Sequence, residues 1–75
     1  MIQTDKTLDI KGLAGLRAET LTWNTLNTMD PGQVLTVVTT DRSAREKLMR
    51  LCEHLGCTLL SLREEGGTLC VQIRK

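Results

Sequence analysis

Three cysteines, Cys52, Cys57 and Cys70, are the residues of this sequence best suited to covalent chemistry. Cysteine ligands of zinc usually recur as closely spaced pairs, whereas four residues separate Cys52 from Cys57, with only His54 nearby. The odd number of cysteines also argues against a disulfide framework. We therefore expect reduced thiols that are mostly structural, no metal site and no cofactor.

The position of each cysteine predicts a different environment. Cys52 shares the apolar face of a predicted helix, where a free cysteine packs as a small hydrophobic residue. Cys57 follows Gly56 at the predicted end of that helix, so it either packs on the last turn or lies partly exposed near His54. Cys70 alternates with apolar neighbours along a predicted strand, which places it on the opposite sheet face as an accessible but unactivated thiol.

The other candidate groups are His54 and a set of basic side chains. No Ser, Cys or Asp lies at a spacing that would pair with His54 for general base catalysis, so a role at the helix end is favoured. If two helix N-termini lie at one sheet edge, basic residues gather there and attract anions or an acidic partner surface. The alternative is a solvated charged rim. These residues are Lys11, Arg17, Arg42 and Arg45.

Length and composition limit the class of protein. A chain of 75 residues allows one compact domain, residues 1–75, without a deep cleft between two domains. The single aromatic residue and the net charge of +1 disfavour nucleic-acid binding, which uses aromatic stacking and basic surfaces. The sequence shows neither an apolar run long enough to span a bilayer nor a secretory signal, so we expect a cytoplasmic protein without a membrane segment.

Periodicity of apolar residues predicts the element order strand, helix, strand, helix, strand, strand. Right-handed connections then give an α+β two-layer sandwich (βαβαββ), with a mixed four-stranded sheet and both helices on one face. The other face stays relatively open, and its apolar content becomes a candidate interaction surface. The predicted ranges, after a loose terminus at 1–6 and with a loop at 11–15, are strand 7–10, helix 16–29, strand 34–39, helix 44–55, strand 58–63, turn 64–67 and strand 68–74.

Residues at the helix ends refine these predictions. Asp41 or Ser43 caps the second helix, and Ser43 with Glu46 fits a capping box. Gly56 stands where a left-handed residue ends that helix. The first helix contains many weak helix formers and depends on packing of its apolar face. That face comprises Ala18, Leu21, Leu26 and Met29.

The element order and four local strings resemble the TusA/SirA-like sulfur-carrier family. The strings are LDIKGL at 8–13, MDPGQVL at 29–35, LCE at 51–53 and IRK at 73–75. The resemblance implies a Cys-Pro-x-Pro motif at the start of the first helix, where the helix N-terminus favours a thiolate that carries persulfide sulfur. The matching positions here hold Gly15, Leu16, Arg17 and Ala18. The nucleophile and both prolines of the motif are absent.

This departure predicts a family member that acts through protein contacts, with a sulfur-relay protein as the expected class of partner. The expected surface comprises Leu13, Ala14, Gly15, Leu16 and Arg17 together with Arg42 and Arg45. One alternative is a sulfur carrier that uses Cys57 or Cys70. A second alternative is RNA binding, which rests on fold analogy alone.

Overall fold

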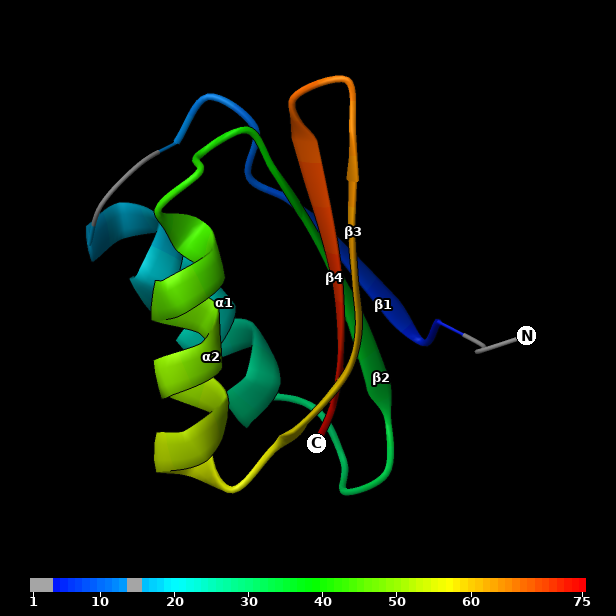
Figure 1. Ribbon diagram of the computed structural model, residues 1–75. Helices are drawn as coiled ribbons and strands as arrows, with labels where there is room; N and C mark the ends of the chain where they lie inside the picture. Colours follow the sequence, from blue (N-terminus) through cyan, green and yellow to red (C-terminus); the bar gives the residue numbers. More distant parts are fainter. Residues whose placement is uncertain (1–3, 14–15) are drawn as a thin grey trace.

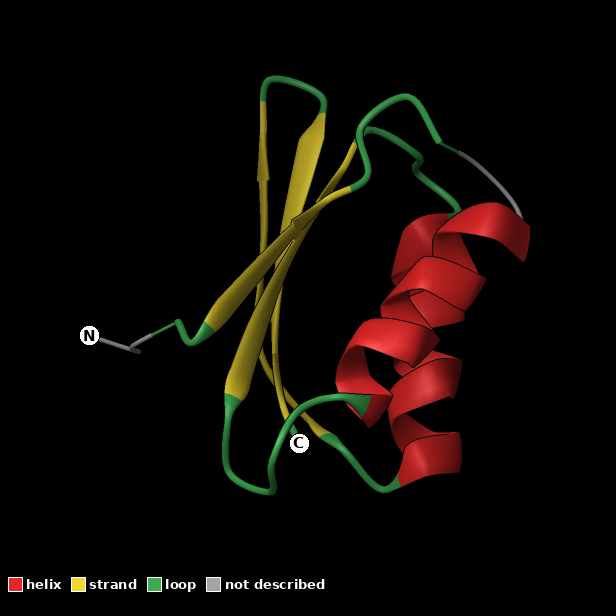
Figure 2. Ribbon diagram, turned by 180° about the vertical axis from the view of Figure 1, so that it is seen from behind, coloured by secondary structure: helices red, strands yellow, loops and turns green. Residues whose placement is uncertain are grey.

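The computed structural model describes residues 4–13 and 16–75. Within them the chain forms two layers, a four-stranded sheet in the order β1-β2-β4-β3 and a pair of helices that cover one of its faces (Figures 1 and 2). The predicted α+β sandwich is confirmed. The elements are β1 (Lys6–Asp9), α1 (Leu16–Asn27), β2 (Val34–Thr39), α2 (Ala44–Leu55), β3 (Thr58–Glu65) and β4 (Thr68–Arg74).

Strand β2 lies inside the sheet, as its β-branched sequence predicts. It pairs in parallel with β1 and antiparallel with β4. Val34 and Thr36, on the face away from the helices, are buried along with the helix-side residues of the strand. Strand β4 inserts between β2 and β3, so the last two strands form an antiparallel hairpin.

Helix α2 has the predicted bounds, but its N-terminus is stabilised differently from the predicted capping box. Ser43 makes no capping hydrogen bond with its side chain. Instead, the backbone N–H and the hydroxyl of Ser43 both donate to Oδ1 of Asp41, over 3.0 and 2.7 Å. At the other end Gly56 adopts a left-handed conformation with φ of 72°, as expected.

The predicted apolar face of α1 is confirmed at Ala18, Leu26 and Met29 but not at Leu21. Leu21 is 38% exposed, whereas Thr22 is fully buried. The hydroxyl of Thr22 donates to the carbonyl oxygen of Ala18 over 2.9 Å, which satisfies its polar group inside the core. The helix ends at Asn27 rather than at the predicted Met29, although Met29 stays buried in the following turn.

Two other boundaries differ from the predictions. Strand β3 continues to Glu65, so the hairpin turn is Gly66–Gly67 and Glu64 and Glu65 belong to the strand. At the other end of the chain, residues 4–6 are tied to β2 rather than loose. The Asp5 N–H donates to the Val34 carbonyl, and the Val34 N–H donates to the Asp5 carboxylate.

The sheet face opposite the helices has a polar centre, contrary to the expected apolar surface. The hydroxyls of Thr4 and Thr36 lie 2.7 Å apart. Gln72 Nε2 donates to Thr4 Oγ1 over 3.3 Å, and Ser61 Oγ donates to Gln72 Oε1 over 2.9 Å. These side chains satisfy one another, so the centre of this face is polar rather than apolar.

Candidate functional site

Both helices begin at one end of the molecule, which we call the upper end. The loop from β1 to α1, the start of α2 and the β3–β4 turn all lie there (Figure 1). The backbone N–H of Gly12 in the first loop donates to Thr40 Oγ1 before α2, over 3.4 Å. Two predicted site residues, Ala14 and Gly15, lie outside the described residues, and Leu16 begins α1.

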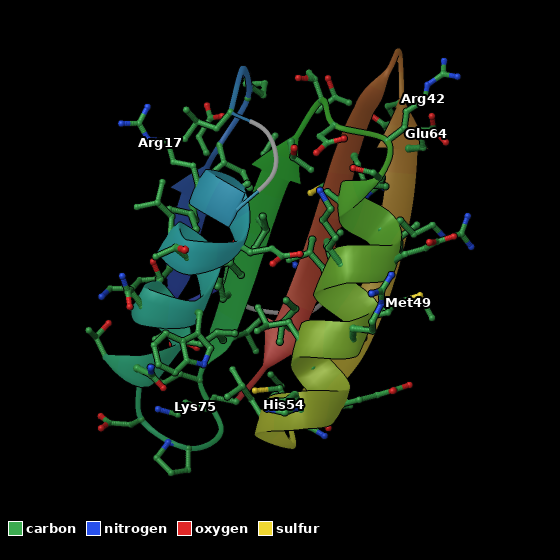
Figure 3. The ribbon with its side chains drawn as sticks, turned by 90° about the vertical axis from the view of Figure 1, so that its left-hand side faces the viewer. Arg17, Arg42, Met49, His54, Glu64 and Lys75 are labelled. Carbon is green, nitrogen blue, oxygen red and sulfur yellow. The ribbon has the colours of Figure 1, made fainter. Side chains whose placement is uncertain are left out.

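The predicted basic residues share this end but do not form one cluster. Figure 3 shows Arg17 and Arg42 at the same end, pointing away from each other on opposite sides. Arg42 and Arg45 line a hollow of about 260 Å³. Lys11 forms an ion pair with Asp9 over 3.6 Å. The upper end therefore presents separate charges at its two helix starts.

Acidic groups share the hollow at the start of α2. Asp41 and Glu64 line it together with Arg42 and Arg45. Sequence analysis missed Glu64 because it placed this residue in a turn. The signal was the alternation along β3, since Glu64 pairs opposite the buried Leu69 and thus lies on the helix side. With two guanidinium groups and two carboxylates, the hollow is charged but nearly balanced.

Leu13 contributes less to the surface than predicted. Its side chain is half-buried and packs against the hydrophobic core. Its backbone N–H donates to the Ile10 carbonyl over 3.0 Å. Leu13 therefore anchors the loop from β1 to α1. Arg17, also part of the predicted surface, is exposed to solvent.

Two of the thiols lie at the opposite, lower end of the molecule, where α2 finishes. Burial, with a smaller contribution from the neighbouring Cys57, raises the pKa of Cys52 to about 11. Burial also raises the pKa of Cys57, partly offset by the Lys75 ammonium group. Both thiols are therefore largely protonated at neutral pH. A protonated thiol is a poor nucleophile.

The third thiol, Cys70, lies on the sheet. It is half-buried on the face away from the helices, where it pairs opposite Val38 of β2 and Arg63 of β3. These positions agree with the sequence analysis for all three cysteines. Within residues 4–13 and 16–75, no three His, Cys, Asp or Glu side chains are grouped so that they could hold a metal ion.

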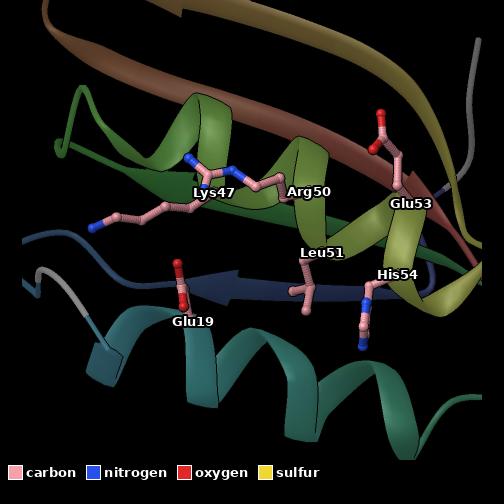
Figure 4. Close-up of a pocket in the computed structure, with 6 residues that line it drawn as sticks. All are labelled: Glu19, Lys47, Arg50, Leu51, Glu53 and His54. Atoms are coloured by element: carbon pink, nitrogen blue, oxygen red, sulfur yellow. The ribbon is translucent and has the colours of Figure 1, made fainter.

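A groove between the two helices was not anticipated. It measures about 510 Å³ and runs along the outer surface of α1 and α2, lined by Glu19, Lys47, Arg50, Leu51, Glu53 and His54 (Figure 4). Trp23, 44% exposed, borders a shallower hollow with Glu19 and Leu51. Since the single aromatic residue of the chain is exposed beside a mixed-charge groove, burial in the core does not explain its position.

Comparisons with known proteins agree with the strings found in the sequence. Residues 6–75 match the model of the family described as sulfurtransferase TusA. The sulfur carrier protein TusA of Pseudomonas paraeruginosa is 35% identical over 95% of this chain and 90% of its own length. A longer relative from Aquifex aeolicus is 31% identical over 99% of this chain, which spans 38% of that relative.

The fold comparison gives the same result. A SirA-like protein from Desulfitobacterium hafniense superposes with a TM-score of 0.82, at 23% identity, over 92% of this chain and 95% of its own. No helix in the described part of the chain is long and apolar enough to cross a membrane. With a family match over nearly the whole sequence and relatives above 30% identity, this chain belongs to the sulfurtransferase TusA family.

Proposed function

We propose that this chain is a non-catalytic interaction module of the TusA family, which contacts proteins of a sulfur relay in the cytoplasm. The observation that carries the proposal is the location of its thiols. Cys52 and Cys57 lie at the C-terminal end of α2, and Cys70 lies on the open face of the sheet. None of the three stands at the start of a helix.

Helix direction explains why this location matters. The N-terminus of a helix carries unpaired N–H groups and a partial positive charge, which stabilise a thiolate and make it a nucleophile. The C-terminal end carries the opposite partial charge. Gly15, which immediately precedes α1, has no side chain to hold sulfur. The chain therefore keeps the scaffold of a sulfur carrier without a thiol in the activating position.

The proposed contact surface is the upper end, where Arg17 at the start of α1 and Arg42 and Arg45 at the start of α2 are exposed. Its hollow beside α2 holds basic and acidic groups in near balance. A balanced pattern of exposed charges suits a complementary protein surface better than a free anion, because each charge specifies the position of an opposite charge. The partner class we propose is a sulfur-relay protein such as a cysteine desulfurase.

The decisive experiment is a sulfur-loading assay. The purified chain is incubated with a cysteine desulfurase and cysteine, and its intact mass is measured without reductant. We expect no added sulfur, whereas the TusA protein of Pseudomonas paraeruginosa in a parallel reaction gains sulfur. A stable sulfur adduct on this chain contradicts the proposal, and peptide mapping then shows whether Cys57 or Cys70 carries it.

A matched variant, Gly15→Cys, tests whether the start of α1 activates a thiol. It places a thiol directly before α1 while leaving the three existing cysteines unchanged. We expect this variant to react with iodoacetamide about tenfold faster than Cys57 at neutral pH, because the helix N-terminus lowers a thiol pKa. Equal rates at both positions contradict the argument from helix direction.

A further inference from the structure

The end of α2 holds two cysteines that the proposed function leaves unused. The backbone N–H groups of Gly56 and Cys57 both donate to the carbonyl oxygen of Cys52, the latter over 2.9 Å. The bond from Cys57 is the 6→1 bond of a Schellman motif, and the side chains at the two positions that it joins commonly contact each other. The turn that ends the helix therefore places these two residues next to each other.

The backbone geometry permits a covalent link between them. The path from the Cα of Cys52 to the Cα of Cys57 runs through the Cys52 carbonyl group, the hydrogen bond and the Cys57 nitrogen. If this path were straight, the two Cα atoms would lie about 7 Å apart, which is the upper limit. The bends at the nitrogen, oxygen and carbon atoms shorten this distance. A disulfide requires Cα atoms roughly 4.4–6.8 Å apart. The separation of the two Cα atoms is therefore compatible with a disulfide.

Burial gives the two thiols different roles. Cys57 is half-buried and reachable from solvent, whereas Cys52 is 4% exposed and packs in the hydrophobic core. A small oxidant therefore meets Cys57 first. Burial raises the pKa of Cys57, and the Lys75 ammonium group offsets only part of this effect, so access to solvent rather than ionisation distinguishes Cys57 from Cys52. Cys52 is then the resolving thiol behind it.

We propose that Cys52 and Cys57 form a modification site that closes into an intramolecular disulfide when a peroxide reaches it. In the first step the Cys57 sulfur attacks hydrogen peroxide, the O–O bond breaks, and a sulfenic acid and one water form. In the second step the Cys52 sulfur attacks the Cys57 sulfur, the S–O bond breaks, and a second water leaves. Two thiols are oxidised by two electrons and the peroxide is reduced.

The test counts thiols in the full chain before and after treatment with hydrogen peroxide. The reduced protein has three free thiols. We expect one alkylatable thiol to remain after oxidation, a mass lower by two hydrogens, and a peptide that links residues 52 and 57. Dithiothreitol should restore all three thiols. Formation of only disulfide-linked dimers, or only sulfinic and sulfonic acids, overturns the proposal.

Two variants separate this pair from the third cysteine. Cys70→Ser should still form the disulfide, leaving no free thiol after oxidation. The Cys57→Ser variant should form no intramolecular disulfide. It should stay monomeric, and both of its remaining thiols should still react with an alkylating agent after brief treatment with hydrogen peroxide. Cys57 is the better position to change because it is only half-buried, whereas substitution of Cys52 disturbs the core. A disulfide between residues 52 and 70 in the Cys57→Ser variant contradicts the assignment.

Discussion

The upper end of the molecule holds the helix N-termini, and the lower end holds two of the three cysteines. Both helices run from the upper end to the lower end on the same sheet face (Figure 1). The upper end therefore has the helix N-termini, where a thiolate is stabilised, but no cysteine stands at either helix start. The lower end has Cys52 and Cys57 but lies at the opposite pole of α2. In this chain the helix N-termini and the paired thiols therefore lie at opposite ends of the molecule.

The lower end also shows that proximity of two thiols does not activate either of them. Cys52 is buried beside Leu48 and its other core neighbours, and its pKa rises to about 11. Figure 3 shows Lys75 and His54 at this end, and the Lys75 ammonium offsets only part of the effect of burial on Cys57. Solvent exclusion outweighs the nearby positive charge.

The largest expected effect is a loss of stability at alkaline pH caused by the lower end. Below about pH 9 the Cys52 thiol is protonated in both the folded and unfolded chain, so it has no effect. Between about pH 9 and 11 the unfolded chain loses this proton first, which favours unfolding. We expect the free energy of unfolding to fall by roughly 2 to 3 kcal/mol across this range because of Cys52.

The measurement is urea unfolding at several pH values, compared with a Cys52→Ala variant. The variant lacks this titration, while the lysines titrate in both proteins. The difference in unfolding free energy between the two chains should therefore narrow as the pH rises. Parallel pH profiles would show that the Cys52 thiol ionises with the same pKa in the folded and unfolded chain.

A smaller effect is expected from Gly56→Ala, which disturbs the turn that joins the two thiols. No atom lies within 4 Å of the added Cβ, so the cost comes from the left-handed backbone conformation alone. We expect a loss of about 1 kcal/mol of stability in urea unfolding and slower closure of the disulfide. Glu53→Ala, at an exposed position of α2, is the control and should change neither property. Normal closure in Gly56→Ala would show that this turn does not position the cysteines.

The smallest effect on stability is expected at the upper end. Arg42 and Arg45 are exposed, so the paired change Arg42→Glu and Arg45→Glu should alter the free energy of unfolding by less than about 0.5 kcal/mol. Binding to a cysteine desulfurase should weaken several-fold, because like charges then face the partner. Surface plasmon resonance measures this affinity, with Arg63→Glu on the open sheet face as control. If both variants weakened desulfurase binding equally, the upper end would not be the specific contact surface.

The periodicity of apolar residues in the sequence was sufficient to predict the two-layer architecture. The β-branched run at 34–39 predicted the inner strand, and the apolar spacing from Ala44 to Leu55 predicted α2 with its glycine end. Both patterns work because each reflects a face that must be buried. The resemblance to the TusA family came from short strings at fixed spacing, and the family match over 6–75 confirms it.

Predictions failed where a side chain had alternative hydrogen-bond partners or a boundary depended on packing. Thr22 is buried and Leu21 is exposed, and a hydrogen bond to its own helix satisfies the buried Thr22 hydroxyl. Ser43 bonds to Asp41 instead of forming a capping box. Glu64 extended β3 because pairing with Leu69 continues beyond the apolar part of the strand. Local propensity does not encode these choices, since their energies differ by about 1 kcal/mol or less.

The sequence alone determined that no cysteine occupies 15–18, because the identity of the residue before α1 does not depend on folding. It also determined the two-layer architecture through the periodicity of its apolar residues. Only the tertiary structure decided where the thiols lie relative to the helix ends, how deeply each is buried, and that a backbone hydrogen bond joins Cys57 to Cys52 across one turn. Thiol reactivity depends on solvent exclusion and on the direction of nearby dipoles, and both arise only when the chain has packed.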